Sequence, residues 1–97
     1  MAGTLTIVAH VRAKRGMHEL MVAEQLRLVA ATRPSPGCLR YELHVSNKDS
    51  ASVTFVEEWA TRDLWLAHME SAHVEAFRAA AGHTIAEFSL HDMHRVG

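Results

Sequence analysis

The feature that most constrains the fold is a change of hydrophobic period that divides the chain into six segments. Three segments alternate apolar and polar side chains, which is typical of strands with one buried face: residues 5–12, 39–45 and 53–59. Two segments repeat apolar side chains every three or four residues, which is typical of amphipathic helices: residues 17–33 and 61–81. We interpret residues 85–96 as a last strand, so the predicted order is β-α-β-β-α-β.

Turn and capping residues separate these segments where the pattern requires it. The segment 34–37 holds two prolines and a glycine and ends the first helix. The polar segment 46–50 predicts a tight hairpin between the second and third strands. Thr61 can cap the second helix, and a break in that helix is predicted near residues 71–72.

Right-handed connections convert this order into one architecture. The four strands form an antiparallel sheet with both helices on one face, which is the ferredoxin-like α+β fold. A chain of 97 residues is long enough for one domain, so residues 1–97 are predicted to form a single unit. The other face of the sheet would be uncovered in a monomer, and we therefore expect a homodimer.

Composition excludes several classes of partner. The net charge is −1 and the basic residues are scattered, so the chain has no electrostatic footprint for nucleic acid. No apolar run reaches the roughly 20 residues that a membrane span needs, and no signal peptide is recognised. Cys38 is the single cysteine, so no disulfide can form within the chain, and a cytoplasmic location is expected.

Eight histidines raise the question of a metal site. His91 and His94 are three residues apart, so they point to opposite faces of a strand. His68 and His73 are five apart, which places them on different sides of a continuous helix. Neither pair has the spacing of metal ligands, and no metal site is predicted.

Three segments resemble the antibiotic biosynthesis monooxygenase family. Pro-Gly-Cys-Leu-Arg-Tyr at 36–41 resembles the family's P-G-C-x-x-Y/F segment, and Phe-Val-Glu-Glu-Trp at 55–59 resembles the end of its third strand. Residues 68–77 resemble its H-x-x-x-x-H-x-x-x-F helix. The resemblance implies a dimeric α+β barrel. Family members include cofactor-free quinol and anthrone oxygenases, heme-degrading oxygenases and enzymes that process signal molecules.

The resemblance does not extend to the residues of the heme-degrading branch. Those relatives use an asparagine on the first strand, a tryptophan on the second helix and a downstream histidine ligand. The first strand here has no asparagine, His68 stands at the tryptophan position, and Arg78 falls near the ligand position unless His73 substitutes. We therefore do not expect heme degradation.

The resemblance places a substrate pocket between the sheet and its helices. Strand alternation puts Phe55, Glu57 and Trp59 on one face. By matching to the family, His68 would look into the pocket, and those three residues together with Trp65 would line it.

Other candidates are open to two interpretations. Tyr41 could orient a substrate or only reach water, and His73 could touch the pocket or hydrogen-bond near the helix break. A buried Glu57 would need a partner, so it would pair with a histidine or form a structural ion pair. Trp59 could simply be a core residue. Glu24 interrupts the apolar stripe of the first helix and could also face the pocket.

The predicted chemistry needs an apolar cavity for an electron-rich ring and a general base. His68 is the predicted base, and deprotonated substrate would then reduce O2 directly without a cofactor. No dinucleotide-binding glycine motif is present. The sequence thus predicts a cofactor-independent monooxygenase acting on a quinol-like or anthrone-like aromatic. The alternatives are a non-catalytic binding or regulatory module, or an enzyme that processes a small carbonyl metabolite.

Overall fold

The computed structural model describes residues 3–97. Its elements follow the order β-α-β-β-α-α-β, which confirms the predicted ferredoxin-like α+β fold. Their bounds are β1 (Leu5–Ala13), α1 (His18–Thr32), β2 (Cys38–Val45), β3 (Ser52–Trp59), α2 (Arg62–Met69), α3 (Ala72–Ala81) and β4 (Ile85–Met93), with a short 3-10 turn, η1 (Gly82–Thr84), before β4.

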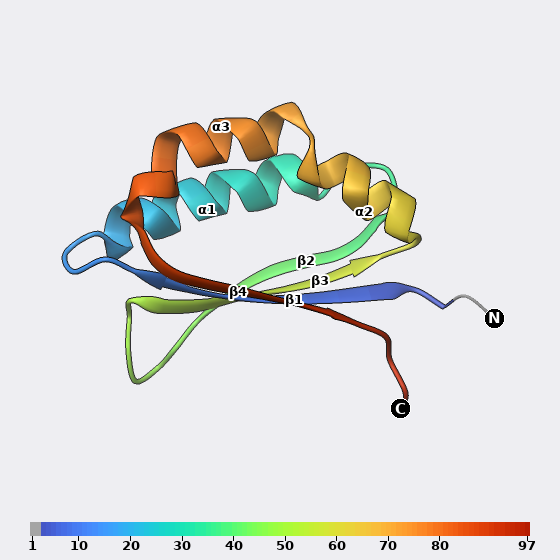
Figure 1. Ribbon diagram of the computed structural model, residues 1–97, viewed down its shortest axis with the longest axis horizontal. Coiled ribbons are helices and arrows are strands. Elements are labelled where there is room, and N and C mark those ends of the chain that lie inside the picture. The colour runs from blue at the N-terminus through green and yellow to red at the C-terminus, as the bar shows by residue number, and fades with distance from the viewer. Residues whose placement is uncertain (1–2) are drawn as a thin grey trace.

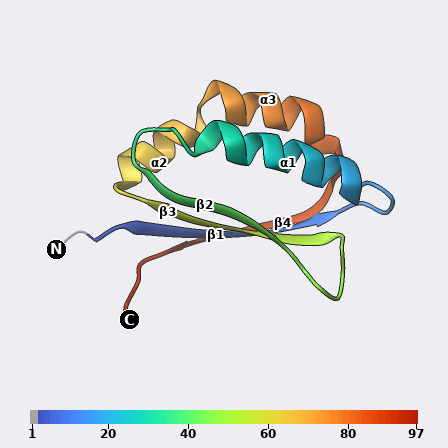
Figure 2. The same ribbon diagram turned by 180° about the vertical axis from the view of Figure 1, so that it is seen from behind.

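The four strands form one antiparallel sheet in the order β2-β3-β1-β4. Ala9 of β1 lies opposite Phe55 of β3 on one side and Leu90 of β4 on the other. All three helices cover the same face of this sheet, as Figure 1 and the reverse view in Figure 2 both show. The molecule therefore has two layers, and its core lies between them.

The core follows the predicted alternation. Every second residue of β1 and β3 is buried against the helices, and Ile7 and Trp59 have no exposed surface. From α1, Met21 and Leu28 are buried against the same layer. Full burial of an apolar side chain of this size contributes roughly 1.5–3 kcal/mol, so this two-sided packing is the main source of stability.

The second helical segment is divided where the sequence predicted a break. The Thr61 hydroxyl accepts a hydrogen bond from the Leu64 amide at 3.2 Å and begins α2. The Ser71 hydroxyl accepts one from the Val74 amide at 3.3 Å and begins α3. Each cap satisfies an amide that has no partner within its own helix. Two capped helices therefore replace one continuous helix.

Gly37 fixes the approach of β2 to the helix layer. Its φ of +78° lies in the left-handed region, which side chains with a β-carbon rarely adopt. A β-carbon at this position would lie 2.9 Å from the Cβ of Leu64 on α2. Only glycine satisfies both conditions here.

The uncovered face of the sheet carries both apolar and polar side chains. In the observed register, Val8 of β1 lies beside Val56 of β3 and His91 of β4, and Met93 lies beside Thr6. His10 on this face bonds the Thr54 hydroxyl at 3.0 Å. No helix within residues 3–97 is long and apolar enough to cross a membrane.

Candidate functional site

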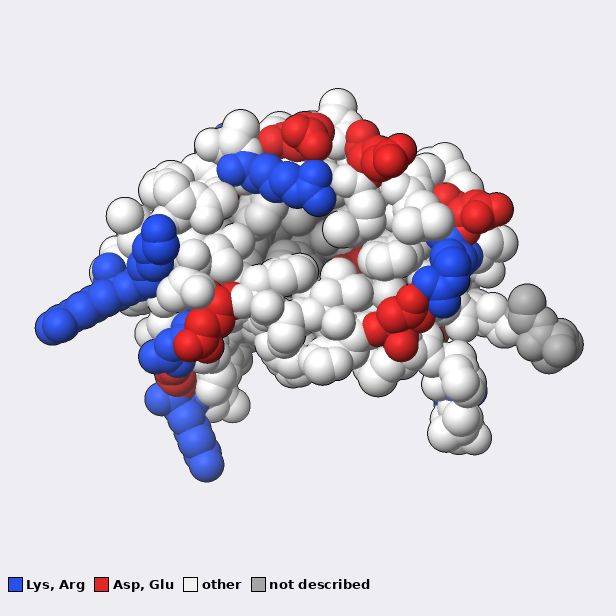
Figure 3. Space-filling model, in the orientation of Figure 1, with Lys and Arg blue, Asp and Glu red and all other residues white. Residues whose placement is uncertain are grey.

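A cavity of about 260 Å³ lies between the sheet and the helix layer. Most of its wall is apolar, and the polar exceptions are Gln25, Tyr41, Glu57, His68 and Arg78. The apolar members are Ala9, Val11, Leu28, Phe55, Met69, Val74, Phe77, Ile85, Phe88 and Leu90. Figure 3 shows this face of the molecule hollowed between helices and sheet, with charged side chains on the upper rim of the hollow.

Glu57 is a carboxyl group inside an apolar wall. Its side chain points from β3 toward the helices, and only 5% of its surface is exposed. The indole Nε1 of Trp59 donates a hydrogen bond to Glu57 Oε1 at 2.9 Å. Burial raises the pKa of Glu57 to about 7, and the bond from Trp59 offsets only part of that rise. The carboxyl can therefore change its protonation state near neutral pH.

His68 reaches the same cavity from the last turn of α2. Its ring lies 4.8 Å from the Trp59 ring and 5.5 Å from the Tyr41 ring, measured between centroids. Burial and, to a smaller extent, the neighbouring His73 lower the pKa of His68 to about 4. The imidazole is therefore neutral at pH 7. Of these two groups, Glu57 is the one whose pKa lies near neutrality.

Tyr41 and Phe55 complete the aromatic part of the wall. Both are buried, and their ring centroids are 5.5 Å apart. Burial raises the pKa of Tyr41, and so does the nearby Glu57 carboxyl. The phenol therefore keeps its proton at neutral pH.

Gln25 is a polar wall residue that the sequence analysis did not select. It has no measurable exposed surface, yet it borders the cavity from α1. The residue that interrupts the apolar stripe in the sequence is its neighbour Glu24. Glu24 does not border the cavity and pairs with Arg27 at 3.7 Å. The spacing of Met21, Gln25 and Leu28 by four and three residues is the signal that would have placed Gln25 on the buried face.

The other sequence candidates lie close to the cavity without bordering it. Trp59 is buried beneath Glu57 and His68, where it packs in the core and donates to Glu57. Trp65 is half-buried on α2 and lies outside the cavity wall. His73 lies behind His68 and shares a hydrogen bond with it, His68 Nδ1 to His73 Nε2, at 3.3 Å. The break between α2 and α3 brings these histidines together, which a continuous helix would not allow.

A smaller hollow of about 180 Å³ lies on the far side of His68. Pro36, Leu64, His68 and His73 are among the residues that border it. His68 is the one residue that borders both this hollow and the 260 Å³ cavity within residues 3–97.

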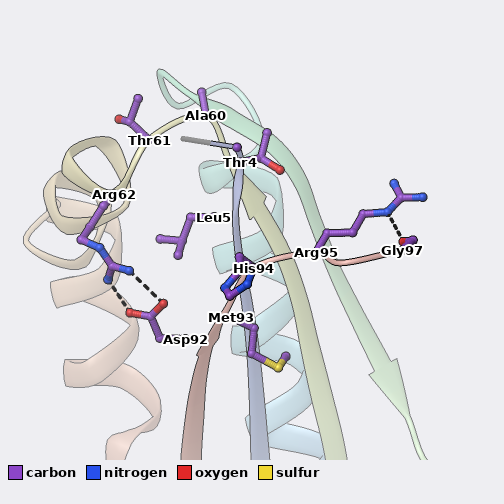
Figure 4. A pocket seen from close by; sticks show the side chains of 11 residues that line it. Thr4, Leu5, Ala60, Thr61, Arg62, Asp92, Met93, His94, Arg95 and Gly97 are labelled. Carbon is purple, nitrogen blue, oxygen red and sulfur yellow. Dashed lines mark hydrogen bonds and ion pairs between the residues drawn. The ribbon is translucent and has the colours of Figure 1, made fainter. Parts of the chain in front are cut away.

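A wider groove of about 780 Å³ lies at one end of the sheet, where the chain termini and the β3–α2 turn meet (Figure 4). Arg62 and Asp92 form an ion pair across it. None of the residues proposed from the sequence to form the substrate pocket borders it, and its lining is largely exposed. The 260 Å³ cavity, whose wall is formed mostly by buried and half-buried apolar side chains, is therefore the better candidate site.

The described part of the chain contains no group of three or more His, Cys, Asp or Glu side chains arranged to hold a metal ion.

The fold and the cavity together define a small-molecule-binding α+β protein.

Comparison with known proteins gives this class a family. The family model described as antibiotic biosynthesis monooxygenase matches residues 4–80. The chain belongs to the antibiotic biosynthesis monooxygenase family, which confirms the resemblance of its three sequence segments. A comparison with curated proteins gave no significant match.

Solved structures agree with this assignment. A protein of Pseudomonas aeruginosa is 27% identical, with a TM-score of 0.94 over 100% of this chain and 98% of its own. A structure described as an antibiotic biosynthesis monooxygenase is 26% identical, with a TM-score of 0.87 over 96% of this chain and 99% of its own. A protein of Shewanella oneidensis is also 26% identical, with a TM-score of 0.87 over 96% of this chain and 91% of its own.

Proposed function

We propose that this protein is a cofactor-free monooxygenase that oxidises a small quinol-like or anthrone-like aromatic with O2. The observation that carries the proposal is a carboxyl group with a pKa of about 7 inside an apolar, aromatic-walled cavity. A general base works best when its pKa lies near the working pH. Membership of the family supports the same class of reaction.

In this proposal Glu57 is the general base. Its carboxylate takes a proton from the bound aromatic, and the resulting anion is electron-rich enough to pass electrons to O2. The substrate supplies all four electrons, so one oxygen atom enters the product and the other leaves as water. For an anthrone, a CH2 group and O2 become a carbonyl group and water. For a quinol, the ring becomes a quinone, one ring C–H becomes C–OH, and the second oxygen atom again leaves as water. Neither reaction needs an external reductant.

His68 is proposed to contact the substrate as a neutral imidazole. With its pKa lowered to about 4, it is a weaker base than Glu57 but can donate or accept a hydrogen bond. The rings of Tyr41 and Phe55 would hold the aromatic substrate in the cavity by edge and face contacts. Trp59 is proposed to act through Glu57, which its indole bonds.

Oxygen consumption tests the proposal. Purified protein, treated with a chelator, is mixed with reduced quinols and anthrones in an oxygen-electrode cell. We expect uptake above the rate without protein, lowered by about 10²-fold or more in Glu57→Gln, the range for loss of a general base. If no substrate of the panel gives uptake while ligands still bind, the non-catalytic binding module becomes the better account. If carbonyl compounds are consumed without O2, an enzyme that processes a small carbonyl metabolite becomes the better account.

A further inference from the structure

Gln25 has an unpaired amide that the fold itself does not explain. Within residues 3–97, neither its Nε2 nor its Oε1 has a hydrogen-bond partner, although the residue has no measurable exposed surface. Buried polar groups are almost always hydrogen-bonded, because an unpaired one loses its water without compensation. The neighbours on the same helix face, Met21 and Leu28, are apolar. A leucine or methionine at position 25 would fill the space without this cost, so the amide points to a ligand.

We propose that Gln25 is the residue of this cavity that binds the oxygen substituent of a hydroxyarene substrate. This inference rests on the proposed function and names the substrate class of the same cavity. Gln25 enters the cavity from α1 and Glu57 from β3, so the two side chains meet a ligand from opposite layers.

The amide suits an oxygen whose charge changes during the reaction. Oε1 accepts a hydrogen bond from a ring hydroxyl, and Nε2 donates one to the oxygen once its proton has moved to the Glu57 carboxylate. The proton transfer gives a neutral carboxyl and a phenolate, so the net charge of the cavity is unchanged. Gln25 is thus a specificity-determining residue that distinguishes a hydroxyarene from a plain arene.

The cavity is large enough for an aromatic ring ligand. An apolar cavity of about 150 Å³ accepts one benzene ring, and the cavity here has about 260 Å³.

The charges at the wall favour a ligand that enters uncharged. Arg78 is the one Lys or Arg side chain among the described residues that border the cavity. It lies at the exposed rim and already pairs with Glu75 at 3.1 Å. No buried cation is therefore available to hold a carboxylate or phosphate inside.

Binding measured without turnover tests the inference. We would titrate 1-naphthol and naphthalene into oxygen-free protein by calorimetry, because these two rings differ by one hydroxyl. The wild-type protein should bind 1-naphthol about tenfold more tightly than naphthalene. In Gln25→Met that preference should disappear. The matched control is Leu28→Met on the same helix and cavity wall, which should keep it.

Each outcome bears on the inference. Equal affinity of wild-type protein for the two ligands, or an unchanged preference in Gln25→Met, overturns the role of Gln25. Should Gln25→Met fail to fold, Gln25→Leu gives the same comparison. A Gln25-dependent preference without oxygen uptake supports the inference while the oxygenase proposal fails. If oxygen uptake occurs and is unaffected in Gln25→Met, the oxygenase proposal stands and the role of Gln25 is overturned.

Discussion

At the scale of single residues, the chemistry of the site is set by how deeply each group is buried. Glu57 and His68 border the same cavity, and burial shifts their pKa values in opposite directions. It raises the pKa of Glu57 to about 7 and is the main cause that lowers the pKa of His68 to about 4. In both cases burial disfavours the charged form, which for an acid raises the pKa and for a base lowers it. The carboxyl is therefore the group that titrates near neutrality, and the imidazole is a neutral partner.

This shift gives a prediction about stability. A carboxyl whose pKa is higher in the folded protein than its usual 4.5 stabilises the fold below pH 4.5 and loses that contribution as pH rises through 7. The loss is at most roughly 3 kcal/mol above pH 7. Glu57→Gln removes the titration and still accepts the Trp59 bond. We expect it to exceed wild type in free energy of unfolding at pH 8, measured with urea, but not at pH 4.5.

The control is Glu58→Gln, the next residue on β3, whose side chain points to the opposite face of the sheet. The gain in free energy of unfolding that we expect for Glu57→Gln at pH 8 should be absent in Glu58→Gln. Comparing variant with wild type at each pH cancels the titration of His68. A Glu57→Gln protein less stable than wild type at pH 8 would show that the charged carboxylate has a stabilising partner.

His68→Ala gives the second prediction. Loss of a wall group that contacts the substrate should lower the oxygenase rate by at least about tenfold, while the packing lost against Trp59 and Tyr41 costs about 2 kcal/mol. His73→Ala, which alters the outer partner and leaves the cavity wall in place, should retain most of the rate. Steady-state kinetics measure the oxygenase rate, and unfolding followed by near-ultraviolet circular dichroism measures the loss of stability. Full activity in His68→Ala would remove His68 from the reaction.

At the scale of elements, the strands were more predictable than the helices. A strand has only two faces, so alternation placed Phe55, Glu57 and Trp59 on one face, and all three are buried. On α1 the apolar residues cover two sides, and a shift of one residue separates Glu24 from Gln25. Sequence period could not resolve that shift. It is settled by packing, which buries Met21 and leaves Leu20 44% exposed.

The helix break explains another difference. The sequence predicted a break near residues 71–72, but the change of direction between α2 and α3 is a matter of tertiary packing. That change brings His68 within 3.3 Å of His73, although five residues on one helix would separate them. The contact between these two histidines therefore depends on tertiary packing, which a local sequence pattern does not show.

Gly37→Ala gives a prediction at this scale. The left-handed φ and the contact with Leu64 should together lower the free energy of unfolding by roughly 2–4 kcal/mol. Gly16→Ala is the matched control, since Gly16 has a φ of +79° but nothing within 4 Å of a β-carbon. It should cost only about 1 kcal/mol. Urea unfolding measures both, and equal losses would mean that contact with Leu64 adds nothing.

At the scale of the whole molecule, the two-layer arrangement leaves one face of the sheet uncovered (Figures 1 and 2). Val8 and Val56 lie side by side near its centre, within a surface that also holds His10 and His91. We propose that a second copy of the chain packs here, as an isologous homodimer.

Light scattering at micromolar concentration tests this proposal. The expected mass is twice the 10.8 kDa of one chain. Val56→Glu, which places a charge at the centre of the uncovered face, should give the monomer mass. Leu66→Glu, at an exposed position on α2, should leave the dimer intact. A wild-type mass near that of one chain would contradict the dimer.

His68 stands between two compartments. One of its sides meets the cavity proposed to hold the aromatic, and the other meets the small hollow that His73 also borders. The ring of His68 is thus the partition between the two spaces. The volume open to a ligand is therefore set by this one side chain, and a smaller residue at position 68 would merge the cavity and the hollow into one.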